Sequence, residues 1–149
     1  MPRSVTVRAP GKVNLQLSVG PRREDGYRPL ATVFQAVELY ETVTATPVLG
    51  GDVTVAVRAQ PTLAFDPASV PLDERNLAVR AARAVAQAYG IDDGVRLEIV
   101  KGVPVAGGMA GGSADAAAAV VACAEAWEVG ATRRELHDLC ASLGSDVPF

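Results

Sequence analysis

Hydrophobic and polar residues alternate along the first part of the chain, a pattern typical of strands that bury one face. Residues 5–8 form a short strand-like segment that is broken at Pro10 and Gly11, and residues 13–19 alternate strictly between the two classes. Further strands are predicted over residues 32–40, 42–45, 53–57 and 95–99. Because the early strands follow one another closely, with a glycine-rich turn before the segment at 53–57, we expect an antiparallel arrangement.

Helical spacing of apolar residues replaces this alternation later in the chain. One helix is predicted over residues 76–89, and a second follows a glycine-rich stretch and runs to Trp127. A third begins at Thr132 with a capping box to Glu135. No repeat or low-complexity linker interrupts the pattern, which predicts one α+β domain over residues 1–149 with helices packed on one side of the sheet.

The glycine-rich stretch at residues 104–116 is the most informative segment, because four of the six positions from 107 to 112 are glycine. Such a loop can adopt positive φ angles and bring backbone N–H groups against an anion, and the following helix adds unpaired donors and a positive dipole. We favour a phosphate cradle over a flexible linker, with Ser113 as the N-cap and Asp115 in the first turn. The stretch lacks both the lysine of a Walker A loop and the glycine spacing of a Rossmann loop, so a phosphate-binding lysine must come from elsewhere.

Charge and composition narrow the range of partners. A formal net charge of −3 and a pI near 5.1 argue against a nucleic-acid partner. No segment has the ~20 consecutive apolar residues of a membrane span, and the N-terminus lacks a signal-peptide core, so we expect no membrane partner and a cytoplasmic location. Cys123 and Cys140 lie among apolar neighbours, which predicts buried, reduced thiols. Lys12 and Lys101 are the only lysines among 14 basic residues, and each lies beside a glycine-containing segment.

Polar residues outside the glycine-rich stretch could also carry chemistry. Lys12 and Asn14 are two residues apart in a predicted strand and must share a face, which could be aimed at a substrate or simply be solvated. Tyr27 follows a charged Asp-Gly turn and could pack against the protein or stack on a planar ring. Asp146 lies in a turn after Gly144, where it could cap a helix, act as a general base or bind a metal.

Several separated motifs together resemble one family. They are APGKVNL at residues 9–15, REDGY at 23–27, RNLAVRAA at 75–82, the glycine-rich stretch at 104–116, and LGSDVPF at 143–149. In this combination the chain resembles, over nearly its whole length, the N-terminal ATP-binding domain of GHMP-superfamily kinases. The resemblance implies a left-handed βαβ crossover in the α+β fold. This fold resembles a domain of ribosomal and translation proteins.

The resemblance implies transfer of the γ-phosphoryl group of ATP, with Mg²⁺, to the 2-hydroxyl of 4-diphosphocytidyl-2-C-methyl-D-erythritol, a cytidine diphosphate sugar alcohol of the non-mevalonate isoprenoid pathway. Asp146 would accept the hydroxyl proton, and Lys12 would orient Asp146 and stabilise the developing charge. The substrate would contact Asn14, Tyr27 and Arg28, the last of which stands where the family usually has a histidine. The nucleotide would contact Asn76, Lys101, Pro104, Val105, Ala106, Gly107, Gly108, Met109, Ala110, Gly111, Gly112 and Ser113.

Kinases of this superfamily have two domains with the active site between them. The resemblance therefore implies that a C-terminal domain is absent from this chain, and that the isolated chain has little or no turnover. Two other functions stay open at this point. The chain could belong to another kinase of the superfamily, acting on mevalonate, homoserine or a sugar, or to a non-catalytic module of the same fold that binds nucleotide or RNA, although the acidic charge weighs against RNA.

Overall fold

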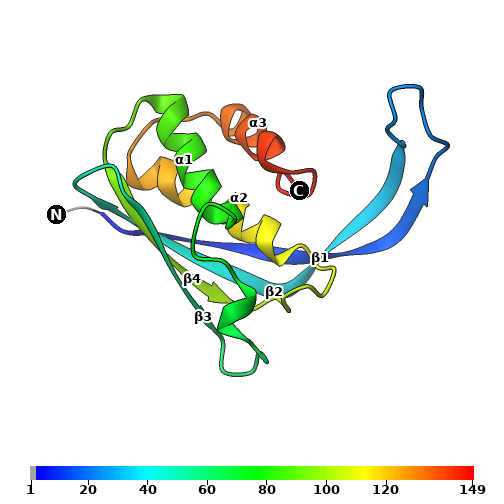
Figure 1. Cartoon of the computed structure of the whole chain (residues 1–149), viewed down its shortest axis with the longest axis horizontal. Coiled ribbons are helices and arrows are strands. Elements are labelled where there is room, and N and C mark those ends of the chain that lie inside the picture. Colours follow the sequence, from blue (N-terminus) through cyan, green and yellow to red (C-terminus); the bar gives the residue numbers. More distant parts are fainter. Residues whose placement is uncertain (1–2) are drawn as a thin grey trace.

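The computed structural model describes residues 3–149, which form one sheet with three α-helices over one of its faces (Figure 1). The strands are β1 (Val5–Val19), β2 (Leu30–Val48), β3 (Val53–Ala59) and β4 (Gly94–Lys101). The helices are α1 (Leu77–Tyr89), α2 (Gly111–Ala126) and α3 (Arg133–Leu143), and a short 3-10 helix spans Pro67–Ser69. The strand order is β1-β2-β4-β3, and all neighbours are antiparallel except β3 and β4. The predicted α+β class, with helices on one side of a mainly antiparallel sheet, is confirmed.

The break predicted in the first strand is wrong, because β1 continues through Pro10 and Gly11. Pro10 pairs with Tyr40 on β2, and a register shift at Gly11 precedes the paired residue Lys12. β1 lies at the edge of the sheet, where a proline leaves no ladder hydrogen bond unmade. Between the pairs Pro10–Tyr40 and Lys12–Ala36, the extra residues lie on β2, while β1 continues through Gly11 to Lys12.

Two further strand predictions also change. The segments at 32–40 and 42–45 form the single strand β2, and β3 does not pair with β2 across the intervening glycine turn. Instead β4 lies between them, antiparallel to β2 and parallel to β3, so β3, α1 and β4 form a parallel crossover unit. The side chains of Val95, Leu97 and Ile99 on β4 are at most 1% exposed, whereas the valines of β3 are half-buried. The more deeply buried of these two strands therefore lies inside the sheet, and the other lies at its edge.

Local capping signals define the helix ends. Asn76 caps α1, which ends at Gly90 in the left-handed conformation with φ 64°. Thr132 and Glu135 form the predicted capping box of α3. The alanine-rich α2 packs on β1 and β2, because its short side chains let the helix approach the sheet closely. Both cysteines are buried and free, as predicted. In the part of the chain that the structure describes, no helix is both long and apolar enough to cross a membrane.

The outer half of the β1–β2 hairpin, residues 13–33, forms an arm that extends well beyond the helices (Figure 1). Five large apolar side chains on this arm are between 50% and 65% exposed: Leu15, Leu17, Val19, Leu30 and Val33. The core lies at the other end of β1 and β2, between the sheet and α1, α2 and α3. The chain therefore consists of a packed body and one projecting hairpin.

Candidate active site

The glycine-rich stretch forms an irregular loop that leads into α2. Ala106, Gly108 and Ala110 have positive φ angles of 58°, 74° and 57°, so the backbone turns sharply before the helix. Ala110 takes the N-cap position and its carbonyl accepts the Ala114 N–H at 2.9 Å, but no side chain among the described residues caps the helix. The expectation that Ser113 is the N-cap is wrong, because the left-handed turn at Ala110 starts the helix earlier. The N–H groups of the first turn are thus left for an anion.

The loop is anchored to β1 beside Lys12. The backbone N–H of Lys12 donates to the carbonyl oxygen of Met109 at 3.0 Å. A Cβ atom on Gly11 would lie 3.1 Å from the Val103 side chain and 3.3 Å from the Met109 oxygen, so this approach favours glycine. The strand that carries Lys12 and the glycine-rich loop therefore form one continuous wall.

Lys12 is the centre of a polar cluster at this wall. Its Nζ donates to Asn14 Oδ1 at 2.8 Å, which confirms that the two side chains share a face, and it lies 3.5 Å from Asp146 Oδ2. The amide of Asn14 is oriented by its own donation to Thr32 Oγ1 at 2.7 Å. The Lys12 ammonium also lies 4.9 Å from the centroid of the Phe34 ring. Lys12 is 7% exposed, so the face that it shares with Asn14 is not simply solvated at this point.

Two cavities flank the start of α2. The larger, of about 550 Å³, is lined by Lys12, Ser113 and Asp146 together with apolar residues of α2 and α3. The smaller, of about 220 Å³, is lined by the side of α2 that carries Gly112 and Asp115. Its other lining residues include these predicted nucleotide contacts: Asn76, Lys101, Pro104, Val105, Ala106 and Gly111. The glycine-rich loop and the first turn of α2 therefore separate a groove that holds a lysine–carboxylate pair from a narrower polar pocket.

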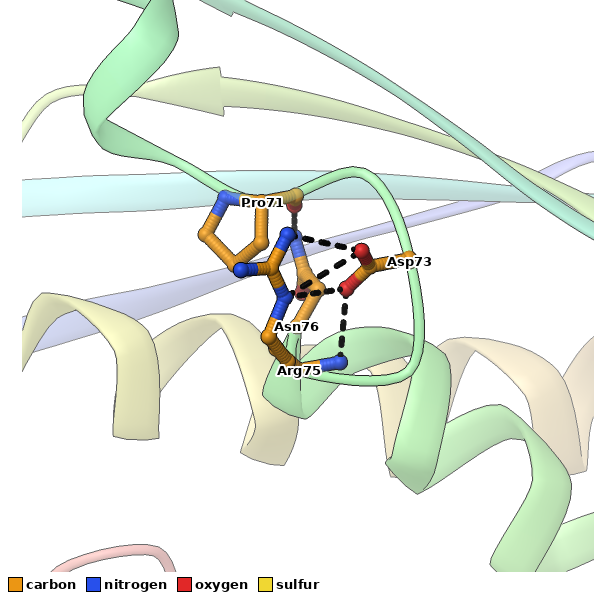
Figure 2. A network of polar contacts seen from close by, with 4 residues as sticks. All are labelled: Pro71, Asp73, Arg75 and Asn76. Carbon is orange, nitrogen blue, oxygen red and sulfur yellow. Dashed lines mark hydrogen bonds and ion pairs between the residues drawn. The ribbon is translucent and has the colours of Figure 1, made fainter.

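Asn76 forms part of the wall of the smaller cavity, and its amide group is already engaged in the fold. Its Oδ1 accepts the Ala78 N–H at 2.9 Å, and its Nδ2 donates to the Pro71 carbonyl at 2.8 Å. Figure 2 shows this amide beside the ion pair between Asp73 and Arg75, whose Nη2 lies 2.8 Å from Asp73 Oδ2. The hydrogen bonds from Arg75 lower the pKa of Asp73 to about 2. This turn holds Asn76 in place at the rim of the pocket.

Lys101 also has protein partners. Its Nζ lies 2.7 Å from Glu41 Oε1 and 2.5 Å from Asp115 Oδ2, and the three side chains are at most 5% exposed. Burial raises the pKa of Asp115 to about 7, with Glu41 adding to the shift and Lys101 opposing it. Burial likewise raises the pKa of Glu41. Burial alone would lower the pKa of Lys101, but the two carboxylates raise it above its ordinary value. We call Glu41, Lys101 and Asp115 the buried cluster.

Glu41 was not singled out in the sequence. The one available signal was a charged residue between two apolar strand segments, which looked like a break between strands. In the structure β2 runs through it, and the side chain is 0% exposed. Asp115, expected in the first turn of its helix, lies in the second turn and faces Lys101.

The structure does not bring Tyr27 and Arg28 to either cavity. Both lie at the tip of the arm, where Tyr27 is 76% exposed and its backbone N–H donates to Asp25 Oδ1 at 3.0 Å. Arg28 Nη1 donates to the Gly20 carbonyl at 3.5 Å. Their substrate contacts stay a prediction. Within residues 3–149 no group of three or more histidine, cysteine, aspartate or glutamate side chains could hold a metal ion.

The fold and site together define the domain class of the small-molecule kinases, with an uncapped helix behind a glycine-rich loop and a lysine–carboxylate pair in the adjoining groove. Residues 76–149 match the family model described as "GHMP kinases N terminal domain". The chain belongs to the GHMP kinase family.

Similar proteins narrow this class further. A protein of Paenarthrobacter aurescens called 4-diphosphocytidyl-2-C-methyl-D-erythritol kinase is 54% identical over 99% of this chain and 46% of its own length. A protein of Streptomyces coelicolor with the same name is 56% identical over 98% of this chain and 47% of its own. The chain thus spans about half the length of the curated relatives it matches.

Solved structures agree with these sequence matches. The crystal structure of a 4-(cytidine 5'-diphospho)-2C-methyl-D-erythritol kinase matches with a TM-score of 0.74 and 36% identity, over 97% of this chain and 48% of that one. A homoserine kinase from Cytophaga hutchinsonii matches with a TM-score of 0.68 at 18% identity, over 94% of this chain and 40% of that one. The second match shows a shared fold alone.

Proposed function

We propose that this chain is the ATP-binding domain of a kinase that phosphorylates the 2-hydroxyl of 4-diphosphocytidyl-2-C-methyl-D-erythritol. The proposal rests on the names of relatives that are more than half identical to the chain. It extends to the domain organisation, in which residues 1–149 form one domain and a second domain completes the site. ATP and a nucleotide-linked sugar alcohol are metabolites of the cytoplasm, so the proposal includes a cytoplasmic location.

The observation that carries the proposed chemistry is the distance of 3.5 Å between Lys12 Nζ and Asp146 Oδ2. Both groups line the groove that begins at the uncapped end of α2. Phosphoryl transfer needs mainly positioning and charge stabilisation, so a base, a cation and a set of amide donors suffice without a covalent nucleophile.

In the proposed reaction Asp146 accepts the proton of the substrate hydroxyl. The side chain of Asp146 is 34% exposed, which leaves its carboxylate accessible from the groove. Lys12 holds this carboxylate in place and stabilises the negative charge that develops on the transferred group. Asn14 fixes the ammonium through its 2.8 Å hydrogen bond, so the lysine is oriented before the substrate arrives.

Phosphate groups would bind to the backbone N–H groups of the glycine-rich loop and of the first turn of α2. The residues present fit Mg²⁺ as well, because this ion is usually bound by one or two protein oxygens together with phosphate oxygens. Ser113 Oγ lines the groove and could serve as a protein ligand, which leaves the carboxylate of Asp146 free to act as the base. Bound Mg²⁺ would neutralise charge on the phosphates, while the loop amides and Lys12 would orient the reacting groups.

The cytidine end of the substrate would reach Tyr27 and Arg28 on the arm. The exposed tyrosine ring offers a face for base stacking, and the exposed apolar side chains of the arm could line the path of the substrate. Arginine at position 28 in place of histidine keeps hydrogen-bond donors but adds a permanent charge.

The test is an assay of a protein that carries this chain at the length of its curated relatives. Asp146→Asn should lower the rate of phosphoryl transfer by roughly 10²–10⁴-fold, the usual contribution of a general base. Asp138→Asn, on an exposed carboxylate of α3, is the matched control and should leave the rate unchanged. An unchanged rate in Asp146→Asn would show that Asp146 is not the general base. Preference for mevalonate or homoserine over the cytidine compound would assign the chain to another kinase of the family.

A further inference from the structure

Glu41 lies where β2, β4 and α2 meet, and its carboxylate is fully buried. Oε2 accepts the backbone N–H of Gly102 at 3.0 Å, and Oε1 lies 2.7 Å from Lys101 Nζ. A buried carboxylate is retained only where charged or hydrogen-bonding partners compensate for the lost water. Here those partners are the last residue of β4 and the residue immediately after it.

The same carboxylate touches the other end of the glycine-rich loop. A Cβ atom on Gly111, the first residue of α2, would lie only 2.7 Å from Glu41 Oε1. Gly102 is equally confined, because its Cβ would lie 2.2 Å from the Tyr40 carbonyl oxygen. Glu41 therefore accepts a hydrogen bond from Gly102, two residues before the glycine-rich stretch, and lies against Gly111, where that stretch enters α2.

Asp115 completes this attachment from the helix side. Its Oδ2 lies 2.5 Å from Lys101 Nζ, which joins the second turn of α2 to the end of β4. The ammonium thus donates one hydrogen bond, to Asp115, and forms an ion pair with Glu41, and the lysine side chain is 4% exposed. Lys101 does not line the larger groove, and its ammonium, which borders the smaller pocket, is already paired with two carboxylates.

We propose that Glu41 is a positioning residue for nucleotide binding, which fixes both ends of the glycine-rich loop, and that Lys101 acts through Glu41 and Asp115 rather than as a direct phosphate ligand. The inference rests on the proposed function, since it assumes that the loop binds ATP. Amide donors held in place before binding need no ordering when the ligand arrives, so they bind more tightly than donors on a mobile loop.

The two roles of Lys101 predict opposite effects of a change at Glu41. If the lysine bound phosphate directly, removing the charge of Glu41 would release the ammonium toward the nucleotide and tighten binding. If the cluster positions the loop, the same change loosens one attachment and weakens binding. Glu41→Gln retains an oxygen that can accept the Gly102 N–H, whereas Glu41→Met of similar length retains none.

The experiment measures the dissociation constant of MgATP by calorimetry for a protein that carries this chain at the length of its curated relatives, and for its variants. Glu41→Met should weaken binding about tenfold or more, the effect of losing a hydrogen bond to a charged group. Glu41→Gln should weaken it less, and this partial rescue separates the hydrogen bond to Gly102 from side-chain volume. Glu38→Met changes an exposed glutamate on the same strand and should bind as the unchanged chain does. Unchanged or tighter binding in both Glu41 variants would overturn the proposal.

Hydrogen exchange of the loop amides gives a second readout that needs no ligand. In Glu41→Gln the amides of residues 103–110 should exchange faster, while those of the α3 helix should not change. If Glu41→Met does not fold, the isosteric Glu41→Gln decides by both measurements. If the protein at the length of the curated relatives does not bind MgATP, the proposed function fails, whereas equal exchange rates in that protein and in Glu41→Gln would separately reject the positioning role of Glu41.

Discussion

The two lysines of this chain are held in opposite ways. Lys12 lies 3.5 Å from the carboxylate of Asp146, which is 34% exposed and faces the larger groove. Lys101 lies within 2.7 Å of two carboxylates that are at most 5% exposed. The first pair is long and partly exposed, so its carboxylate can accept a hydrogen bond from an incoming hydroxyl. The buried cluster is closed, so its charges can act only on the protein around them.

This difference assigns the two lysines different roles, one in the proposed chemistry and the other in the stability of the fold. A partly exposed pair contributes little to stability, about 0–1 kcal/mol, because solvent screens it. Removing any one member of a buried cluster lowers the free energy of unfolding strongly, because a charge is then left without a partner and away from water. Sequence alone marks both lysines as unusual, and burial decides which of them is available to a ligand.

The largest expected effect is on stability, from Lys101→Met. This change leaves Glu41 and Asp115 facing each other without a cation, so the free energy of unfolding should fall by about 3–5 kcal/mol. Arg83→Met is the control, because Arg83 pairs with Glu74 on the surface and should cost less than about 1 kcal/mol. Urea denaturation followed by circular dichroism measures both. Equal losses in the two variants would mean that the buried cluster does not differ from a surface pair.

Lys12→Met should lower activity strongly and stability little, the reverse of what we expect for Lys101→Met. We expect phosphoryl transfer, in a protein at the length of the curated relatives, to fall by roughly 10²–10³-fold, as when a charge-stabilising donor is removed. The free energy of unfolding should change by less than about 1 kcal/mol, because the lost ion pair is partly exposed. A loss of stability as large as that of Lys101→Met would erase the distinction between the two lysines.

Local signals in the sequence were enough to predict much of this site. The period of a strand put Lys12 and Asn14 on one face, and apolar spacing from Asn76 and the capping box at Thr132 indicated the starts of two helices. The glycine-rich stretch indicated a loop before a helix, which the structure contains. Each of these signals depends on residues close together in the chain, where the backbone conformation follows from the residue types.

What the sequence did not predict depends on contacts between distant residues. Glu41 and Gly102 are 61 residues apart, and no local pattern reveals that a carboxylate in one strand accepts the N–H after another. The place of β4 between β2 and β3 likewise depends on pairing between strands that are distant in the sequence. Ser113 failed as an N-cap because the backbone at Ala110 adopts a left-handed turn that its residue type does not suggest.

A smaller effect is expected where the buried cluster meets α2. Gly111→Ala would place a Cβ atom 2.7 Å from Glu41 Oε1, so we expect a loss of about 1–3 kcal/mol in the free energy of unfolding, as for an overpacked core. Gly112→Ala is the matched control, because its Cβ would meet only the Leu77 side chain at 4.0 Å. Thermal and urea unfolding of both variants measure the difference. Two variants of equal stability would show that the helix start can move away from Glu41.

A pH-dependent effect concerns the proton on Asp115, which distinguishes the buried cluster from the pair at Lys12. Burial raises the pKa of Asp115 from 3.8 to about 7, so between these values the folded protein holds a proton that the unfolded chain has released. Stability from this group is therefore fully present below pH 4 and is lost as the pH rises toward 7. The slope can reach at most about 1.4 kcal/mol per pH unit.

Asp115→Asn removes this titration and should flatten the decline in the free energy of unfolding between pH 4.5 and 7.5. Part of the slope should persist, because the pKa of Glu41 is also raised, while Lys101 keeps its charge throughout this range. Asp73 and Glu135, whose pKa values are lowered, contribute with the opposite sign near and below pH 4 and equally in both proteins. Urea titrations at several pH values measure the two slopes. Identical slopes would mean that Asp115 is ionised in the folded protein at all these pH values.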